Sequence, residues 1–174
     1  MKIQTVGIIK SSISEPSLAA KSHGIERKES AAEAIARHRA QRQKTSEIII
    51  EDRWEELLDG IEGFSHLVVL YWAHLVPEES RSLTRVHPMG VKENPLTGIF
   101  ATRSPARPNP VLMTIVQLLS REGNVLKVTG LDAVDGSPVI DIKPYTGETF
   151  SAGDVRVPEW MARILRETQQ EKAE

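Results

Sequence analysis

Residues 111–131, VLMTIVQLLSREGNVLKVTGL, are the stretch from which we infer the fold. The runs 111–120 and 124–131 are rich in β-branched and other apolar residues, which is typical of strands. The residues between them, Arg-Glu-Gly-Asn at 121–124, have the composition of a hairpin turn. We therefore expect two neighbouring strands that pair antiparallel.

Further short strands are expected on both sides of this hairpin. The run FSHLVVLYWAHL at 64–75 is apolar on both faces, which predicts a central strand buried on two sides. Other strands are expected at 3–10, 47–50, 96–102 and 139–142. The strands do not alternate with long helices, which argues against a doubly wound α/β fold. The predicted fold class is mainly β: a small antiparallel β-barrel with a few peripheral helices.

One peripheral helix is expected in the N-terminal half. Residues 30–33 have capping-box spacing and residues 34–43 are strong helix formers. Ile35 is the one large apolar residue of this segment, so the helix can bury little and is expected at the surface. We interpret it as part of a helical insertion at about residues 18–41. Residues 11–29, which include the start of this insertion, read as loop.

A second helix is expected near the C-terminus. Pro158 fits the first turn of a helix that continues to about Glu167. We therefore divide the chain into a β-barrel domain at 1–145 and a C-terminal extension with this helix at 146–174.

Composition excludes several classes of function. The chain has 174 residues, with 22 Lys or Arg against 24 Asp or Glu, which gives a formal net charge of −2. It has no cysteine, which excludes disulfides, thiolate zinc sites, iron–sulfur clusters and cysteine nucleophiles. A pI of about 6.2 is not that of a dedicated nucleic-acid-binding protein. A bound RNA would therefore need a local basic patch.

Several familiar motifs are missing. The sequence contains no Gly-x-Gly, so it lacks the dinucleotide fingerprint and the glycine loop of Rossmann-type methyltransferases, and it has no P-loop and no His-Glu-x-x-His. The five histidines show no ligand spacing, so no metal is expected. No apolar run reaches the length of a membrane span, and the first residues, MKIQ, lack the apolar stretch of a signal peptide. The cytoplasm is therefore the expected location.

The strongest chemical signal is the run GIFATRSPARPNP at 98–110, which we call the basic shelf. Three prolines and an asparagine make its backbone rigid, and Arg103 and Arg107 project from it. No acidic residue occurs between Asn94 and Arg121. Such a shelf suits a carboxylate, a phosphate or an RNA backbone. A Pro-rich turn whose arginines pair with structural acids is an equally good interpretation.

A second signal is a group of acid–base residues around a tight turn. The group contains three aspartates, a lysine and a phenol, namely Asp132, Asp135, Asp141, Lys143 and Tyr145. Aspartates are common in turns because they bond their own backbone, and Asp141 and Lys143 share a strand face as an ion pair could. The same residues would also form a reasonable acid–base cluster.

A third signal is a pair of histidines in the central apolar run. His66 and His74 are eight residues apart, so they lie on the same face of a strand. A histidine in an apolar strand is most often a satisfied core residue. His74 stands at the end of the strand, where ligands approach, and is the better functional candidate.

These motifs resemble the TrmO family of β-barrel methyltransferases, also called TSAA-domain proteins. The resemblance is carried by FATRSP at 100–105, RPNP at 107–110, GFSH at 63–66, and DGSPV at 135–139 with DIKPY at 141–145. The matching blocks keep the family's order over more than half of the chain. The resemblance implies a small barrel that works as a homodimer, with S-adenosylmethionine bound near the subunit interface. It also implies methylation of the exocyclic amine of threonylcarbamoyl-adenosine, beside the anticodon of threonine tRNAs.

Site residues follow from the resemblance position by position. It implies cofactor binding by Gln43, Lys44, His74, Leu75, Arg103, Met113, Gly130, Leu131 and Asp132. For catalysis we expect Asp132 or Asp135 as the base, with Lys143 and Tyr145 as orienting groups. Contacts with tRNA are expected from Arg42, Arg107 and Asn109, although Arg107 and Asn109 are equally suited to holding the basic shelf in shape.

The sequence also departs from the family pattern. Lys44 stands where glycine is common, and Leu112 replaces a glycine where the backbone would approach the cofactor. Residues 18–39 form a longer segment than is typical of the family. Two alternatives therefore stay open: a methyltransferase with another RNA or a small-molecule acceptor, and a regulatory module that binds S-adenosylmethionine without catalysis.

Overall fold

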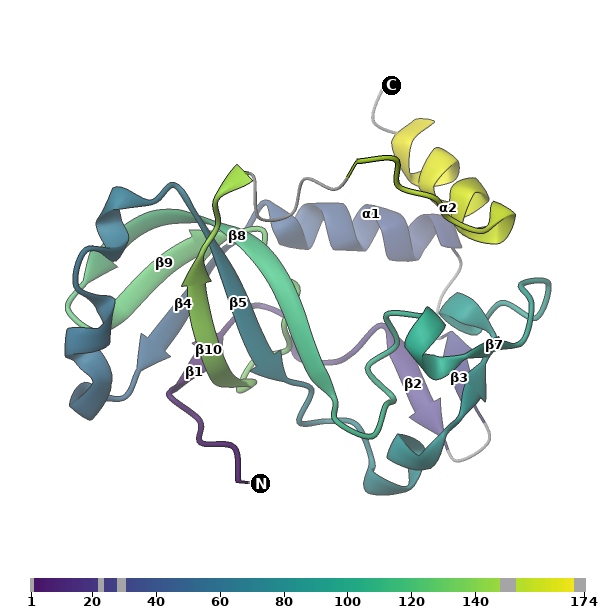
Figure 1. Ribbon diagram of the computed structural model, residues 1–174, viewed down its shortest axis with the longest axis horizontal. Coiled ribbons are helices and arrows are strands. Elements are labelled where there is room, and N and C mark those ends of the chain that lie inside the picture. Colours follow the sequence, from purple (N-terminus) through teal and green to yellow (C-terminus); the bar gives the residue numbers. More distant parts are fainter. Residues whose placement is uncertain (1, 22–23, 28–30, 148–152, 171–174) are drawn as a thin grey trace.

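Six strands close into an antiparallel barrel (Figure 1). The computed structural model describes the chain except for residues 1, 22–23, 28–30, 148–152 and 171–174. Around the barrel the order is β1 (Gly7–Lys10), β10 (Pro138–Pro144), β5 (His66–Trp72), β8 (Val111–Glu122), β9 (Val125–Thr129) and β4 (Thr45–Ile50). The predicted mainly β fold with a small antiparallel barrel is confirmed.

The barrel core is built by all six strands. Burial alternates along β4, which places Ile48 and Ile50 inside. The core also contains Ile9, Leu67, Val69, Tyr71, Val116, Leu126, Val128 and Val139. Strand β5 is buried at three consecutive residues from Leu67 to Val69 and lies between β10 and β8, as expected of a central strand.

The strands β8 and β9 form the hairpin that the sequence predicted. Its turn contains Gly123, whose φ of 61° lies in the left-handed region that glycine adopts without strain. Just before the turn, Arg121 donates hydrogen bonds to the Leu58 carbonyl at 3.0 Å and to Glu62 at 3.1 Å. These bonds hold the short 3-10 helices η1 (Asp52–Leu58) and η2 (Ile61–Gly63) against this end of the barrel.

The barrel closes through a short seam at β1. This strand pairs with β4 along its whole length but with β10 only at Gly7 and Ile8. A side chain at position 7 would collide with β4, since a Cβ there would lie 2.3 Å from the Ile49 carbonyl oxygen. The strand begins at Gly7, so the predicted strand 3–10 was too long at its N-terminal end.

A smaller group of elements lies beside one end of the barrel (Figure 1). It consists of a hairpin, β2 (Leu18–Lys21) with β3 (Gly24–Arg27), a second strand pair, β6 (Arg85–Val86) with β7 (Thr97–Gly98), and the 3-10 helices η3 (Glu78–Ser82), η4 (Pro88–Gly90) and η5 (Ile99–Ala101). The sequence had predicted loop where β2 and β3 pair. These strands are only four residues long and pair with each other. Each is too short to show a clear alternation of apolar and polar residues in the sequence.

The predicted strand at 96–102 was wrong in extent. Only Thr97–Gly98 is a strand, and the chain then turns through η5. Ile99 is buried, and the Thr102 amide and hydroxyl both donate to its carbonyl, at 3.2 and 2.8 Å. These local bonds replace the cross-strand bonds that a longer strand would need.

Both predicted helices are present. Helix α1 (Ala31–Arg42) leads from the smaller group of elements back to β4, and α2 (Glu159–Gln170) lies near the smaller group (Figure 1). Arg163 of α2 donates a 2.6 Å hydrogen bond to the Asn94 side chain. Within the described residues, neither helix is long and apolar enough to span a membrane. The domain boundary at residue 145 stays a prediction.

Candidate functional site

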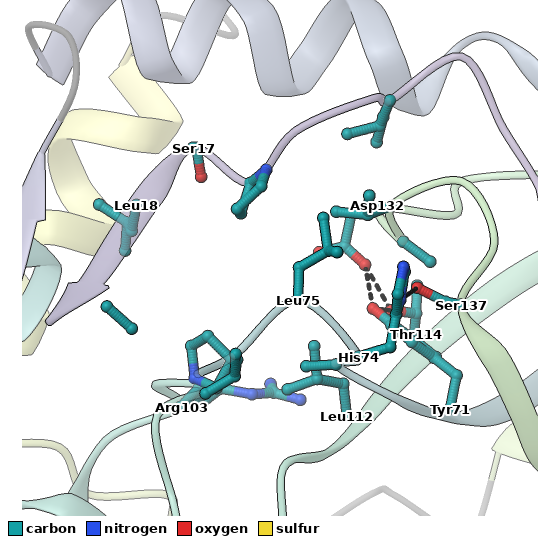
Figure 2. A pocket seen from close by; sticks show the side chains of 18 of the residues that line it. Ser17, Leu18, Tyr71, His74, Leu75, Arg103, Leu112, Thr114, Asp132 and Ser137 are labelled. Carbon is teal, nitrogen blue, oxygen red and sulfur yellow. Dashed lines mark hydrogen bonds between the residues drawn. The ribbon is translucent and has the colours of Figure 1, made fainter. Parts of the chain in front are cut away.

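A cavity of about 1060 Å³ lies where the barrel meets the smaller group of elements (Figure 2). The C-terminal end of β5 and the start of β8 form its barrel wall. Residues 13–20 and the end of α1 line it from outside the barrel. The basic shelf and the loop at 132–137 complete the lining. Segments far apart in the sequence therefore meet at one end of the barrel, where a ligand can be enclosed.

One carboxylate oxygen in this cavity is held by two hydroxyls. Asp132 follows β9, and its Oδ1 accepts hydrogen bonds from the Tyr71 hydroxyl at 2.9 Å and the Thr114 hydroxyl at 2.5 Å (Figure 2). The two hydroxyls lie 3.1 Å from each other. Tyr71 and Thr114 come from the paired strands β5 and β8, so the barrel register sets the direction of the carboxylate.

The electrostatics of this cluster keep the Tyr71 hydroxyl protonated, so that it remains a hydrogen-bond donor. Burial raises the pKa of the Tyr71 phenol, and the neighbouring Asp132 carboxylate raises it further. A phenol whose pKa lies above its ordinary value stays protonated at neutral pH. Tyr71 can therefore donate to Asp132 throughout the neutral range.

His74 lines the cavity in a turn two residues beyond the end of β5, so the predicted strand at 64–75 was too long and His74 does not share a strand face with His66. Its Nδ1 is 3.3 Å from the hydroxyl of the buried Ser137, on the loop that precedes β10 (Figure 2). Next to Ser137, Gly136 has a φ of 77°, and a Cβ there would lie 3.8 Å from the other ring nitrogen of His74. The loop backbone thus passes close to the imidazole and fixes its place.

The two shelf arginines differ in their contacts. Arg107 donates to the carbonyls of Ser104 and Thr102, both at 2.7 Å, so it holds the basic shelf in shape. Arg103 is exposed and lines the cavity, and it has no hydrogen bond or ion pair with another described residue. A guanidinium with unused donors at a cavity wall suits a carboxylate or phosphate ligand.

The charged residues of the cavity favour an anion over most of its wall. Four arginines line it, against two acids; they are Arg37, Arg42, Arg103 and Arg107, with Glu15 and Asp132. Asp132 is the acid that comes from the barrel side, so a ligand with both an anionic and a cationic group would match both ends of this arrangement.

The structure brings about half of the predicted site residues to the cavity. Those that line it are Arg42, His74, Leu75, Arg103, Arg107, Met113 and Asp132. Leu131 is buried in the barrel core beside it. Gly130, Gln43, Lys44 and Asn109 are not part of the lining, and the last three are exposed.

The predicted acid–base group is not brought together. Asp135 accepts a 3.0 Å hydrogen bond from the Ser11 amide and ties the loop to the chain after β1. Lys143 pairs with Asp141 at 2.6 Å, and the Tyr145 ring contacts His66 with centroids 6.3 Å apart. Tyr145 bonds the His66 carbonyl at the start of β5 and Lys143 lies opposite Val68, whereas Asp132 contacts Tyr71 near the end of that strand.

Sequence reasoning missed the partners of Asp132. Tyr71 lies within an apolar run, where a phenol needs a partner for its hydroxyl, and this need was the available signal. Thr114 gave a weaker signal, as a hydroxyl in the apolar run 111–116. The reasoning also missed residues 13–20, which read as loop and line the cavity.

The described part of the chain holds no group of three or more His, Asp or Glu side chains that could bind a metal ion.

Three comparisons with known proteins bear on this site. The family model of the tRNA-methyltransferase O N-terminal domain matches residues 28–150. A probable S-adenosyl-L-methionine-binding protein of Methanothermobacter thermautotrophicus is 51% identical over 108 residues, which cover 62% of this chain and 74% of that protein. The tRNA (adenine(37)-N6)-methyltransferase of Escherichia coli is 44% identical over 90 residues, which cover 49% of this chain.

A solved structure is also similar. TrmO from Pseudomonas aeruginosa aligns with a TM-score of 0.62 and 26% identity over 90% of this chain. The aligned part covers 60% of that protein, and the match to the Escherichia coli methyltransferase covers 38% of that enzyme. The chain therefore spans less than two thirds of these two relatives.

Proposed function

Because the chain belongs to the tRNA-methyltransferase O family, we propose that it transfers the methyl group of S-adenosylmethionine to an adenine base of tRNA. The cofactor would occupy the cavity at the end of the barrel. The observation that carries this proposal is the lining of that cavity, where Arg103 has unused donors and Asp132 is fixed by two hydroxyls.

The lining fits the chemistry of the cofactor. Binding cavities for small molecules commonly measure about 300–1,000 Å³, so a cavity of about 1060 Å³ has room for it. Arg103 suits the cofactor carboxylate, and Asp132 suits a cationic group. Leu112 and Met113 provide apolar wall for the adenine ring. The Leu112 side chain occupies space that the family's glycine would leave open.

The proposed mechanism uses these side chains for positioning and for one proton. When bound, the cofactor supplies an electrophilic methyl group that an amine nitrogen attacks in line. Tyr71 and Thr114 hold Asp132 Oδ1 in one direction by donating hydrogen bonds to it. We assign Asp132 as the acceptor of the proton that the adenine amine loses. A carboxylate suffices as the acceptor, because a nitrogen that gains a methyl group becomes strongly acidic.

The finer identity of the substrate is part of the same proposal. A threonylcarbamoyl-adenosine beside the anticodon of threonine tRNAs has a delocalised, more acidic amine, which matches a weak base such as Asp132. We also propose that the protein works in the cytoplasm as a homodimer. Gln43, Lys44 and Asn109, which are exposed outside the cavity, would then be available to a partner subunit or to RNA, as would Lys143 and Tyr145.

Mass analysis of nucleosides tests the function directly. Purified protein is incubated with methyl-labelled S-adenosylmethionine and unmodified or threonylcarbamoylated tRNA, with and without a chelator. We expect labelled N6-methylated threonylcarbamoyl-adenosine in the second tRNA, at a rate the chelator leaves unchanged. Label in the unmodified tRNA alone would contradict the finer substrate, and no label in either would contradict the activity.

A second function, S-adenosylmethionine binding without catalysis, has one supporting observation. Archaeal relatives at 50 and 51% identity carry the description of S-adenosyl-L-methionine-binding proteins and no activity in their names. Calorimetric binding of the cofactor together with no methylation of any tRNA would favour this function.

A further inference from the structure

We propose that Phe100 and Arg85 form a docking surface for single-stranded RNA beside the cavity, where a base stacks on the Phe100 ring and Arg85 binds an adjoining phosphate. The proposal rests on the proposed function and deepens it, because it places the nucleotides that neighbour the acceptor base.

Phe100 is displayed to solvent by a fixed backbone. Its side chain is 80% exposed, the highest value among the large apolar side chains of the described residues. The preceding Ile99 is 5% exposed, and its amide donates to the Thr84 carbonyl at 2.9 Å. The Thr102 amide bonds back to Ile99 at 3.2 Å. The ring is therefore held outward by an anchored turn. Stacking of a base on it costs little backbone entropy of the protein, because the turn is already fixed.

Arg85 lies across the strand pair from the residue that leads into this turn, and it has unused donors. It lies opposite Gly98 in the β6–β7 pair. Gly98 precedes Phe100 by two residues. Arg85 is exposed and makes no hydrogen bond or ion pair with another described residue. A Cβ built on Gly98 would meet no atom within 4 Å, so the space above Gly98, opposite Arg85, is open. A nucleotide could enter there without moving a side chain.

The charge of the surroundings selects RNA as the occupant. The basic shelf that carries Phe100 has no acidic residue, and none occurs between Asn94 and Arg121. An exposed aromatic ring next to cations is the arrangement with which proteins bind single-stranded nucleic acid, by base stacking and phosphate contact. A helical stem could not offer an unstacked base to the ring, so the occupant is a loop or a single strand.

The surface lies close to the cavity along the chain. Arg103 lines the cavity and follows Phe100 by three residues, a span of at most about 11 Å in an extended chain. That is close enough for neighbouring nucleotides of one loop. A base on Phe100 would therefore hold the loop while the acceptor base enters the cavity.

Fluorescence anisotropy with a labelled RNA stem-loop, and with a labelled single strand of its loop sequence, tests the surface. Stacking of one base predicts that Phe100→Ala weakens binding about 5- to 150-fold. Phe100→Tyr should bind like the wild type, whereas Phe100→Leu should bind like Phe100→Ala because it lacks a ring. Arg85→Gln should lower the slope of log affinity against log salt by about 0.7.

The controls separate RNA contact from folding and from cofactor binding. Leu57→Ala removes another exposed apolar side chain, 69% exposed on η1, and should not change RNA affinity. Calorimetry should show unchanged cofactor affinity in all Phe100 and Arg85 variants, and light scattering an unchanged oligomeric state. If the Phe100 variants lose RNA binding only by dissociating a dimer, the surface is a subunit contact and the inference is wrong.

Failure of this inference can be told from failure of the proposed function. Full methylation and wild-type RNA affinity in Phe100→Ala would overturn the docking surface and leave the activity intact. Ring-dependent RNA binding without methylation of any tRNA would support the surface and overturn the activity. A wild-type protein that binds neither RNA probe would overturn the surface.

Discussion

The hydroxyl of Tyr71 donates a hydrogen bond of 2.9 Å to Oδ1 of Asp132, although 61 residues separate the two in the sequence. The Thr114 hydroxyl donates to the same oxygen. Two barrel strands and the loop after β9 thus converge on one carboxylate. The position of this carboxylate therefore follows from the strand pairing of the barrel. A substitution at any of the three residues should alter the position of the other two side chains.

Asp132→Asn should lower methyl transfer while the cofactor still binds. A positioned base typically contributes about 10²–10⁴-fold to a rate, so we expect a loss of that size in single-turnover methylation. Calorimetry should show that the cofactor still binds, with an affinity that falls less than the rate because Arg103 keeps its contact. Asp135→Asn is the matched control: its amide oxygen can still accept from the Ser11 amide, so the variant should fold like the wild type and leave turnover nearly intact. Wild-type rates in Asp132→Asn would show that no aspartate base operates.

Tyr71→Phe should change how stability depends on pH. The folded pKa of Tyr71 is raised above its ordinary value of about 10, so the unfolded chain releases the phenol proton first. This stabilising contribution is fully present below about pH 10 and is lost as pH rises above it. Urea unfolding at about pH 8 and pH 10.5 should show a smaller loss in Tyr71→Phe than in the wild type. Tyr145→Phe, the control, should keep the wild-type loss.

The same variant should be less stable at neutral pH. A typical hydrogen bond contributes about 1 kcal/mol, and the hydroxyl of Tyr71 bonds both Asp132 and Thr114. We expect the free energy of unfolding of Tyr71→Phe to fall by about 1–2 kcal/mol. An unchanged urea midpoint would show that water replaces the hydroxyl without loss.

Arg103→Ala should weaken cofactor binding by about 1.5–3 kcal/mol, the contribution of a charge-assisted hydrogen bond. Arg103→Lys should recover only part of it, because lysine lacks the planar fork. Arg107→Ala is the contrasting variant: it should lower the melting temperature, since Arg107 bonds two shelf carbonyls. Near-normal cofactor affinity in both Arg103 variants would mean that this guanidinium contacts RNA or solvent instead.

Gly7→Ala should destabilise the barrel. A Cβ at this position would lie 2.3 Å from the Ile49 carbonyl oxygen, and the backbone of β4 would have to move. Overpacking of this kind typically costs about 1–3 kcal/mol, which thermal unfolding would show as a lower melting temperature. Gly63→Ala, where a Cβ meets nothing within 4 Å, is the control.

Local patterns predicted most of the barrel. The hairpin of β8 and β9 is encoded by two strand-forming runs and a turn with Gly123, and β5 by an apolar run of strand length. The strand predicted at 96–102 failed because Thr102 bonds back to Ile99, a local choice that residue preferences do not reveal. Strand preference and turn composition therefore predict long strands that are neighbours in the sequence. They fail to predict a segment in which a side chain bonds a nearby backbone group.

The site was less predictable, because its contacts are long-range. Arg103 and Asp132 were found from their motifs, and both line the cavity. Tyr71 and Thr114 reach Asp132 only through the register of β5 with β8, which a single sequence does not specify. For the same reason Lys143, near Asp132 in sequence, lies opposite Val68, and Tyr145, just past β10, bonds the first residue of β5.

The short seam at β1 has a consequence for dynamics. Two residue pairs and three flanking backbone hydrogen bonds, at Val6, Ile9 and Gly136, join the β1 segment to β10 and its preceding loop, whereas β5 and β8 pair over seven residues. Elements held by few bonds open at lower free energy than the rest of a fold. The loop at 132–137 leads directly into β10, so local opening of the seam would loosen the cavity wall while β5 and β8 stay paired. Faster hydrogen exchange at Ile9 and Val139 than at Val69 and Val116 would show this order, and equal rates would exclude it.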